Sequence, residues 1–182
     1  MRIVAGRHRG RRLAAPEGDG VRPTHDRARE AVFGILEHGT PPLAGSRFLD
    51  LFAGTGANGL EAVSRGAASA MLVERDDAAL RAMAANRTAL GEERTVGILR
   101  ADATRLPRAT RAYDIAFLDP PWGSGLHEAA LAGLLAGGWL APGGRVVCEL
   151  SPRETLEPPT GLAVEDERRY GKARFVFLRV AA

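Results

Sequence analysis

The sequence predicts an α/β fold in which helices pack on the faces of a parallel sheet. Short apolar segments of strand length alternate with helical segments from residue 47 to residue 150, as in successive βαβ units with right-handed crossovers. The chain has 182 residues, of which 45% are hydrophobic and 26% are charged, and both values are ordinary for a globular protein. A disordered, collagen-like or coiled-coil chain is therefore excluded, and the length favours a single domain.

Apolar runs, helical spacing and glycine stops predict the individual elements. Strands are expected at 48–52, 70–74, 96–100, 114–118 and 145–150, followed by a hairpin-like pair at 162–165 and 175–180. Helices are expected at 24–38, 60–65, 77–90 and 126–135. Thr24 is the expected N-cap of the first helix, because its side chain can accept a backbone hydrogen bond in the first turn.

Positive charge is concentrated near the N-terminus. Residues 1–29 contain eight arginines and three acidic residues, a net charge of +5, whereas the rest of the chain carries −2. Residues 2–5 and 11–14 are expected to pair as two short strands around a glycine-bounded turn. Such a basic block favours a polyanionic partner, although a solvated arm is the alternative. The candidate contacts are Arg7, Arg9, Arg11, Arg12 and Arg22.

A glycine-rich loop follows the first expected strand. Gly54, Gly56 and Gly59 have the spacing G-x-G-x-x-G, and Glu74 ends the next strand 20 residues after Gly54. Glycines let a nucleotide approach the backbone closely, and a carboxylate at the second strand can accept hydrogen bonds from both ribose hydroxyls. The pattern therefore predicts an adenosine cofactor, and by itself it leaves NAD and S-adenosylmethionine open.

Two observations favour S-adenosylmethionine. Asp50 precedes the glycines on the strand itself, where it can reach a methionine ammonium group directly or through water but would repel a pyrophosphate. We also expect no further domain after the sheet that could hold the substrate of a nicotinamide enzyme. Asp102, which follows the third strand, is expected to accept a hydrogen bond from the adenine amino group, or alternatively to cap the short segment after it.

A second motif, Asp119-Pro120-Pro121-Trp122, follows the fourth expected strand. Ligands of open α/β sheets bind at this edge. The two prolines have no N–H, so the loop offers a carboxylate and carbonyls as acceptors beside a flat aromatic ring. The Asp119 carboxylate and the Pro120 carbonyl can hold the two N–H groups of a planar amine, and Trp122 can stack on a base that has left its own stack. These four residues are the predicted catalytic corner for methyl transfer to a nucleobase amine.

Several classes of site and location are not expected. Cys148 is the single cysteine, which excludes an internal disulfide and a zinc site of cysteines, and His8, His25, His38 and His127 share no ligand spacing, so no metal is expected. No apolar run approaches the length of a membrane span, and the first residues lack the apolar segment of a secretory signal. We therefore expect a reducing cytoplasm.

These residues resemble a known family. The segment from Asp50 to Gly56 resembles the first motif of class I S-adenosylmethionine-dependent methyltransferases, and the segment from Asp119 to Trp122 resembles their amino-methylating fourth motif. Residues 2–13, 22–33 and 59–67 are similar to the RsmD-type 16S rRNA guanine-N2 methyltransferases. The resemblance runs from residue 2 to about residue 150, and Tyr170-Gly171 fits the end of the family's pattern.

The resemblance implies a Rossmann-like seven-stranded sheet, mostly parallel with an antiparallel last strand and helices on both faces. It implies an N-terminal β-hairpin extension (1–20) on a catalytic core (21–182), and methyl transfer from S-adenosylmethionine to the N2 amine of a guanine in 16S rRNA. A monomer that acts on an assembling small ribosomal subunit is expected. The implied cofactor residues are Asp50, Phe52, Ala53, Gly54, Gly56, Asn58, Glu74, Arg75, Asp102, Ala103 and Thr24. Arg22, Thr24 and Asp26 would close over both ligands, and the basic extension would contact RNA.

Three positions depart from the family's usual pattern: His25 replaces Thr, Asn58 replaces Leu, and Trp122 replaces Tyr or Phe. The larger ring of Trp122 changes the expected size of the base pocket. The alternatives are an adenine-N6 or glutamine-N5 methyltransferase, whose relatives usually carry Asn at the position of Asp119, a nicotinamide oxidoreductase, and a non-catalytic RNA-binding module. Neither of the last two accounts for both the glycine loop and the acceptor-rich corner.

Overall fold

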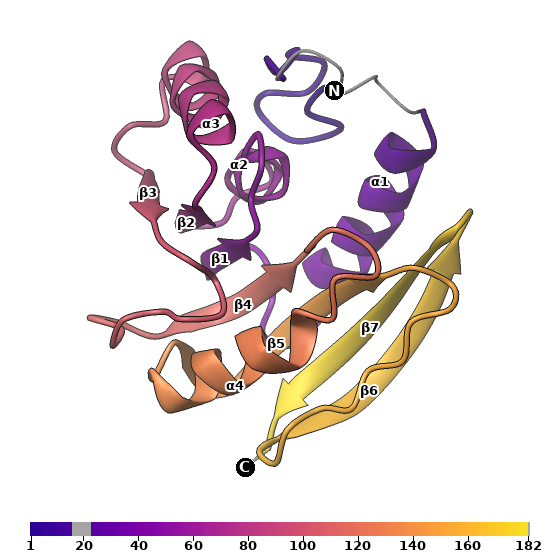
Figure 1. Cartoon of the computed structure of the whole chain (residues 1–182). Coiled ribbons are helices and arrows are strands. Elements are labelled where there is room, and N and C mark those ends of the chain that lie inside the picture. Colours follow the sequence, from indigo (N-terminus) through magenta and orange to yellow (C-terminus); the bar gives the residue numbers. More distant parts are fainter. Residues whose placement is uncertain (16–22, 182) are drawn as a thin grey trace.

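A seven-stranded sheet lies at the centre of the molecule (Figure 1). The structure is a computed structural model that describes residues 1–15 and 23–181. The strand order is β3-β2-β1-β4-β5-β7-β6, and β7 is antiparallel to both of its neighbours while the other pairings are parallel. This arrangement confirms the predicted fold class. The strands are β1 (Arg47–Leu51), β2 (Ser69–Glu74), β3 (Val96–Arg100), β4 (Tyr113–Leu118), β5 (Leu140–Leu150), β6 (Leu162–Tyr170) and β7 (Ala173–Val180).

Helices cover both faces of the sheet, because side chains alternate between the faces along each strand. Phe48 of β1 packs in a core with α1, α2, α3 and the N-terminal segment, whereas Leu49 packs in a second core with α4. The helices are α1 (Pro23–Glu37), α2 (Ala57–Ser64), α3 (Asp77–Leu90) and α4 (His127–Ala136). Among the described residues, no helix is long and apolar enough to cross a membrane.

The N-terminal segment is folded onto α2 and α3 and is not a free solvated arm. Ile3 is completely buried, and the backbone N–H of Arg7 donates to the carbonyl of Ser64 at 2.9 Å. Gly6 has φ +78°, and a Cβ there would lie 1.9 Å from the same Ser64 oxygen, so the close approach requires glycine. The strand pairing predicted over 2–5 and 11–14 is reduced to one antiparallel bridge, Arg2 with Arg12, because the backbone of residues 4–8 bonds to α2 instead.

Several predicted boundaries shift. The helix α1 begins at Pro23, whose fixed φ suits a first helical position, so the expectation that Thr24 is the N-cap is wrong. The side chain of Thr24 and all of Arg22 lie outside the residues whose placement is described. The helix α2 starts three residues earlier than predicted, directly after Gly56 at φ +79°. The strand β5 starts at Leu140 and β6 extends to Tyr170, so the C-terminal pair is longer than expected.

The carboxyl ends of β1, β2, β4 and β5 meet at one edge of the sheet. The chain leaves β1 through Phe52 at φ +59°, a left-handed conformation that is unusual for a residue with a side chain. This turn brings the glycine loop over the edge, beside the loop that leaves β4. The fold thereby places both sequence motifs at one location, as ligand sites of open α/β sheets require.

Candidate functional site

Two adjoining cavities lie at the carboxyl edge of the sheet. Their volumes are about 600 Å³ and about 410 Å³, within the range of small-molecule sites. Both are lined by Phe52, Gly54, Asp119, Trp122 and Glu149. The two sequence motifs therefore form the common wall, and a molecule in one cavity lies next to a molecule in the other.

Glu74 lies in the larger cavity, where backbone donors fix its carboxylate. Oε2 accepts from the N–H of Gly54 at 3.0 Å, and Oε1 accepts from the N–H groups of Arg75 and Asp76 at 2.7 and 3.0 Å. A carboxylate has about four acceptor positions, so one position on Oε2 remains open. Glu74 can therefore accept a hydrogen bond from one ribose hydroxyl, whereas the sequence analysis expected it to accept from two.

Asp102 combines the two roles that the sequence left open. Its Oδ1 accepts from the backbone N–H and the hydroxyl of Thr104, at 2.9 and 2.7 Å, which is the capping role. Its Oδ2 accepts from Arg75 at 3.1 Å, and Asp102 lines the larger cavity together with Ala103. The hydrogen bonds from Thr104, together with the charge of Arg75, lower the pKa of Asp102. Asp102 is therefore a fixed carboxylate with acceptor capacity at the cavity wall.

Asp50 lies beneath the glycine loop and lines neither cavity. It is completely buried, and its Oδ2 accepts from the N–H of Gly59 at 2.9 Å, which anchors α2 to β1. Its Oδ1 is buried without a hydrogen-bond partner, and burial raises the pKa of Asp50 to about 8. Gly56 is also absent from both linings, whereas Ala53 and Asn58 line the smaller cavity.

The corner after β4 separates the two cavities. Pro120 is buried and Pro121 is exposed, and both line the larger cavity. Trp122 is 45% exposed, which makes it one of the two large hydrophobic side chains exposed in the described structure. Burial raises the pKa of Asp119 to about 6, while the positive charge of Arg29 opposes that rise. The predicted corner thus consists of a partly buried carboxyl beside an exposed aromatic ring.

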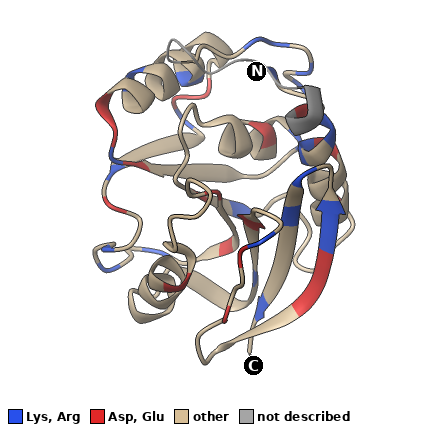
Figure 2. Cartoon of the chain, turned by 45° about the vertical axis from the view of Figure 1, so that its right-hand side comes forward, with Lys and Arg blue, Asp and Glu red and all other residues tan. Residues whose placement is uncertain are grey.

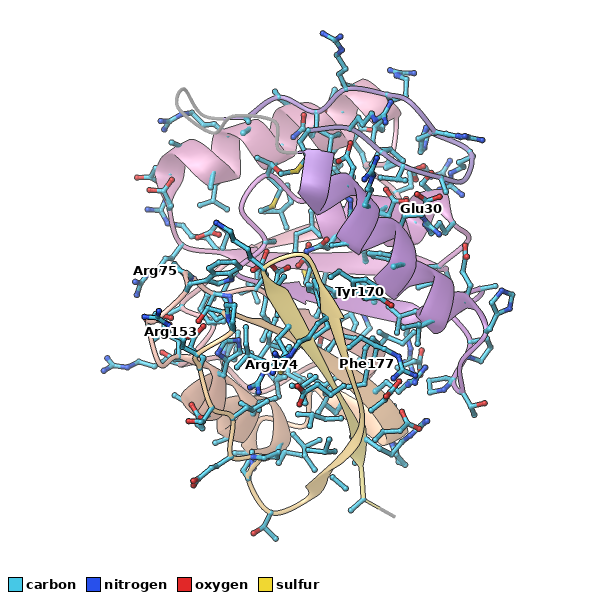
Figure 3. The ribbon with its side chains drawn as sticks, turned by 90° about the vertical axis from the view of Figure 1, so that its right-hand side faces the viewer. Glu30, Arg75, Arg153, Tyr170, Arg174 and Phe177 are labelled. Carbon is cyan, nitrogen blue, oxygen red and sulfur yellow. The ribbon has the colours of Figure 1, made fainter. Side chains whose placement is uncertain are left out.

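Several residues of the smaller cavity were missed by the sequence analysis. Glu149 lies at the end of β5, Arg29 comes from α1, and Tyr170 and Lys172 come from the turn between β6 and β7. Figure 3 shows Tyr170 at this turn, beside α1. Glu149 carries a sequence signal that could have identified it, because it is the one acidic residue in the apolar run from Val146 to Leu150.

Figure 2 shows basic residues along the N-terminal segment. The contacts of these arginines divide them into two groups. Arg7 donates to Glu92 from Nε and Nη2, at 2.8 and 2.6 Å, and Arg11 donates to the carbonyl of Ala89 at 2.7 Å. Arg9 and Arg12 are exposed, and their side chains form no ion pair or hydrogen bond with the described part of the chain. Arg2 also pairs with Asp26, at 3.1 Å, so three cations hold the segment in place, and Arg9 and Arg12 remain unpaired within the described residues.

The architecture and the site define the class of protein. The chain has the features of class I methyltransferases, whose cofactor is S-adenosylmethionine. These features are a Rossmann-like sheet with β7 antiparallel, a glycine loop after β1 and a carboxylate at the end of β2. The residues present fit this group. A Cβ on Gly54 would meet no atom within 4 Å, so the loop leaves space for a ligand, and Asp50 holds an unpartnered buried oxygen directly below.

Comparisons with known proteins identify the family. A family model described as Conserved hypothetical protein 95 matches residues 1–179, and the chain belongs to this family, the RsmD family. Ribosomal RNA small subunit methyltransferase D of Escherichia coli K12 is 39% identical over 141 residues, covering 78% of this chain and 70% of the relative. The Haemophilus influenzae protein of the same name is 31% identical, covering 94% and 89%. The solved structure of yhhF from Escherichia coli has a TM-score of 0.83 at 33% identity, covering 100% and 98%.

Proposed function

We propose that the protein transfers a methyl group from S-adenosylmethionine to the exocyclic N2 amine of a guanine in 16S rRNA. The observation that supports this proposal best is the pair of adjoining cavities with Asp119 and Trp122 in their common wall. The larger cavity suits an adenosine, the smaller one suits a flipped-out base, and the reacting groups would meet at Asp119. Two relatives that carry the name ribosomal RNA small subunit methyltransferase D support an rRNA substrate.

The corner after β4 can activate a base amine without a nucleophile of its own. The lone pair of such an amine is delocalised into the ring, and acceptors at the Asp119 carboxylate and the Pro120 carbonyl return electron density to nitrogen. Trp122 offers a face on which a base can stack, worth about 1–3 kcal/mol. A pKa near 6 suits Asp119 for taking the proton that nitrogen must lose when it is methylated. When bound, S-adenosylmethionine supplies the electrophilic methyl group.

The remaining residues position the two reactants, which can provide about 7–11 kcal/mol of the acceleration. Glu74 and Asp102 have acceptor positions for the ribose and the adenine, and Phe52, Ala53, Gly54, Asn58, Arg75 and Ala103 form the surrounding wall. Asp50 and Gly56 lie beneath the glycine loop and support it. The Oδ2 atom of Asp50 already accepts from Gly59, so its unpartnered Oδ1 is the atom that we assign to the methionine group of the cofactor.

We further propose that the chain is one domain that acts as a monomer on an assembling small subunit. Arg9 and Arg12 on the N-terminal segment and Lys172 at the mouth of the smaller cavity would contact phosphates around the target base. The assignment of Arg7 and Arg11 to RNA contacts is less direct, because both already bind α3 or the loop after it. Arg22 and Thr24, which lie outside the described residues or side chains, remain assigned as in the sequence analysis.

The proposal is tested by methyl transfer in parallel reactions. Radiolabelled S-adenosylmethionine is offered with small-subunit particles, free 16S rRNA, DNA and a release factor, and the labelled product is identified by nucleoside or peptide analysis. We expect N2-methylguanosine in rRNA. Label in N6-methyladenosine or N5-methylglutamine would replace the proposed substrate by one of the alternatives.

Asp119→Ala isolates the role of the corner. We expect loss of transfer with unchanged calorimetric affinity for S-adenosylmethionine, because Asp119 acts on the substrate amine. Glu93→Ala, which removes an exposed carboxylate far from the cavities, is the matched control and should retain full activity. Turnover of Asp119→Ala within about threefold of the unmodified protein would contradict the mechanism.

A further inference from the structure

Glu149 and Asp119 are register neighbours on adjacent parallel strands. Leu118 of β4 pairs with Cys148 of β5, so the two acids follow one paired position. Leu118 and Cys148 pack in the core with α4, and the alternation of side chains directs Asp119 and Glu149 toward the opposite face, where Arg29 of α1 lies. Paired parallel strands are about 4.8 Å apart, so the carboxyl groups extend side by side into the cavities.

The Glu149 side chain is partly buried at the cavity wall and has no donor of its own. Burial, and secondarily the negative charge of Asp119, raise the pKa of Glu149 to about 8, while Arg29 opposes the rise. Nothing in residues 1–15 or 23–181 donates a hydrogen bond to its side-chain oxygens, although its backbone carbonyl bonds to His127 at 2.8 Å. A partly buried carboxyl without protein donors is stabilised when water or a ligand supplies them. Its position in the lining of both cavities lets a bound ligand supply such donors.

The guanine edge provides donors in the pattern that these two acids can accept. The amine at C2 carries two N–H groups, and the adjacent ring nitrogen N1 carries a third. Adenine instead presents a lone pair at N1 beside its amine. If Asp119 and the Pro120 carbonyl hold the amine, the neighbouring ring nitrogen of the same base faces the next strand, which is β5 with Glu149.

We propose that Glu149 is the residue that selects guanine, by accepting a hydrogen bond from N1–H while Asp119 holds the N2 amine. In its ionised form, the Glu149 carboxylate would face the N1 lone pair of an adenine in the same orientation, and the cavity would reject that base. The inference rests on the proposed function, and it assigns the choice of base to β5 and the chemistry to the corner after β4. The sequence departure at Trp122 then affects stacking but leaves the choice of base unchanged.

The test compares guanine with 2-aminopurine, which keeps the amine but has a lone pair at N1. Small-subunit rRNA is prepared with 2-aminopurine at the position that the unmodified protein methylates, and kcat/KM is measured for both substrates at about pH 9, where Glu149, with its pKa raised to about 8, is ionised. We expect a loss of roughly 10- to 100-fold with 2-aminopurine, the effect of one hydrogen bond to a charged group. Because 2-aminopurine also lacks O6, 6-thioguanine, which retains N1–H, is the control base and should remain a good substrate.

The variant Glu149→Gln tests whether the preference between the two bases can be reversed. Its amide can donate to the N1 lone pair, so the variant should lose activity on guanine and regain it on 2-aminopurine, which a purely structural role of Glu149 would not produce. Calorimetric affinity for S-adenosylmethionine should remain unchanged, and Glu157→Gln, an exposed loop residue, should behave like the unmodified protein.

The outcomes separate the two proposals. If the unmodified protein methylates guanine and 2-aminopurine within about threefold of each other, Glu149 does not read N1, while the proposed function stands. The same conclusion follows if Glu149→Gln weakens cofactor binding and keeps the preference for guanine. If no guanine of rRNA is methylated at all, the proposed function fails and this inference fails with it. The first comparison needs no variant, so it decides the question even if Glu149→Gln does not fold.

Discussion

Substitution of Glu61 by Gln should release the N-terminal segment from the core. Glu61 is completely buried in α2, and its carboxylate accepts from the backbone N–H groups of Val4 and Ala5 at 2.7 and 3.0 Å. It also accepts from Nε of Arg65 at 2.7 Å, one turn further along α2. A glutamine keeps one acceptor oxygen, so it can satisfy Ala5 and Arg65 but turns its NH₂ group toward the N–H of Val4.

The expected cost follows from these contacts. One hydrogen bond to a charged acceptor is lost, which costs about 1.5–3 kcal/mol, and a buried donor is left opposite another donor. The buried guanidinium of Arg65 loses its nearest counter-charge, and breaking a buried ion pair costs about 3–5 kcal/mol. Because these effects overlap, we expect the free energy of unfolding to fall by about 3 kcal/mol, a large share of the roughly 5–15 kcal/mol of a folded domain.

Two measurements check this expectation. Denaturant unfolding gives the free-energy change, and hydrogen exchange should show faster exchange at the amides of Val4 and Ala5 than elsewhere. Glu30→Gln is the matched control, because Glu30 is exposed on α1 and forms no contact of this kind with the described residues (Figure 3). A loss below about 1 kcal/mol for Glu61→Gln, or unchanged exchange in residues 1–15, would refute the reasoning.

Three further predictions concern the loop, the extension and the corner. Gly59→Ala should lower the melting temperature and weaken the cofactor affinity measured by calorimetry, because the new Cβ would lie 2.1 Å from a Leu72 methyl group. Overpacking of this kind costs about 1–3 kcal/mol, and an unchanged melting temperature would contradict the prediction. Joint replacement of Arg9 and Arg12 by Gln should weaken rRNA binding and flatten its salt dependence, measured by filter binding, whereas Arg47→Gln, which breaks a pair with Asp114, should leave the slope unchanged. Because Asp119 can take the proton of the amine only when it is ionised, and its pKa is raised to about 6, kcat/KM should fall as pH drops below about 6. A flat profile down to pH 5 in protein that stays folded by circular dichroism would argue against an ionised Asp119.

The elements that could be predicted from the sequence are those whose signals are local. The helix at 77–90 and the strand at 96–100 have their predicted bounds, because Asp76 caps the helix, Gly91 ends it and the strand is a short apolar run. The start of α1 was misjudged, because Thr24 and Pro23 are competing local signals. The reduced pairing of residues 2–14 could not be predicted, since the partner of that backbone is a carboxylate 57 residues away from Val4.

The candidate site shows the same division. Asp119, Glu74 and Gly54 belong to contiguous motifs, and the structure places all three in the cavity walls. Glu149 and Tyr170 come from strands that meet the motifs only through the order β4-β5-β7-β6, so their roles depend on the register of the sheet. Single residues on distant strands carry no spacing pattern, and the sequence therefore identified the cofactor side of the site better than the substrate side.

Arg29 connects the two parts of the molecule that the sequence treated separately. Its Nη2 donates to the carbonyl of Arg2 at 3.0 Å and to Asp26 at 2.7 Å, and its Nε lies 3.9 Å from Glu61, the residue that holds the N-terminal segment. The same buried guanidinium lines the smaller cavity, and its positive charge lowers the pKa values of Asp119 and Glu149 against the effect of burial. Displacement of the segment would therefore change the electrostatics of the corner, so that the segment proposed to contact RNA and the carboxyl groups proposed to hold the base form one connected unit.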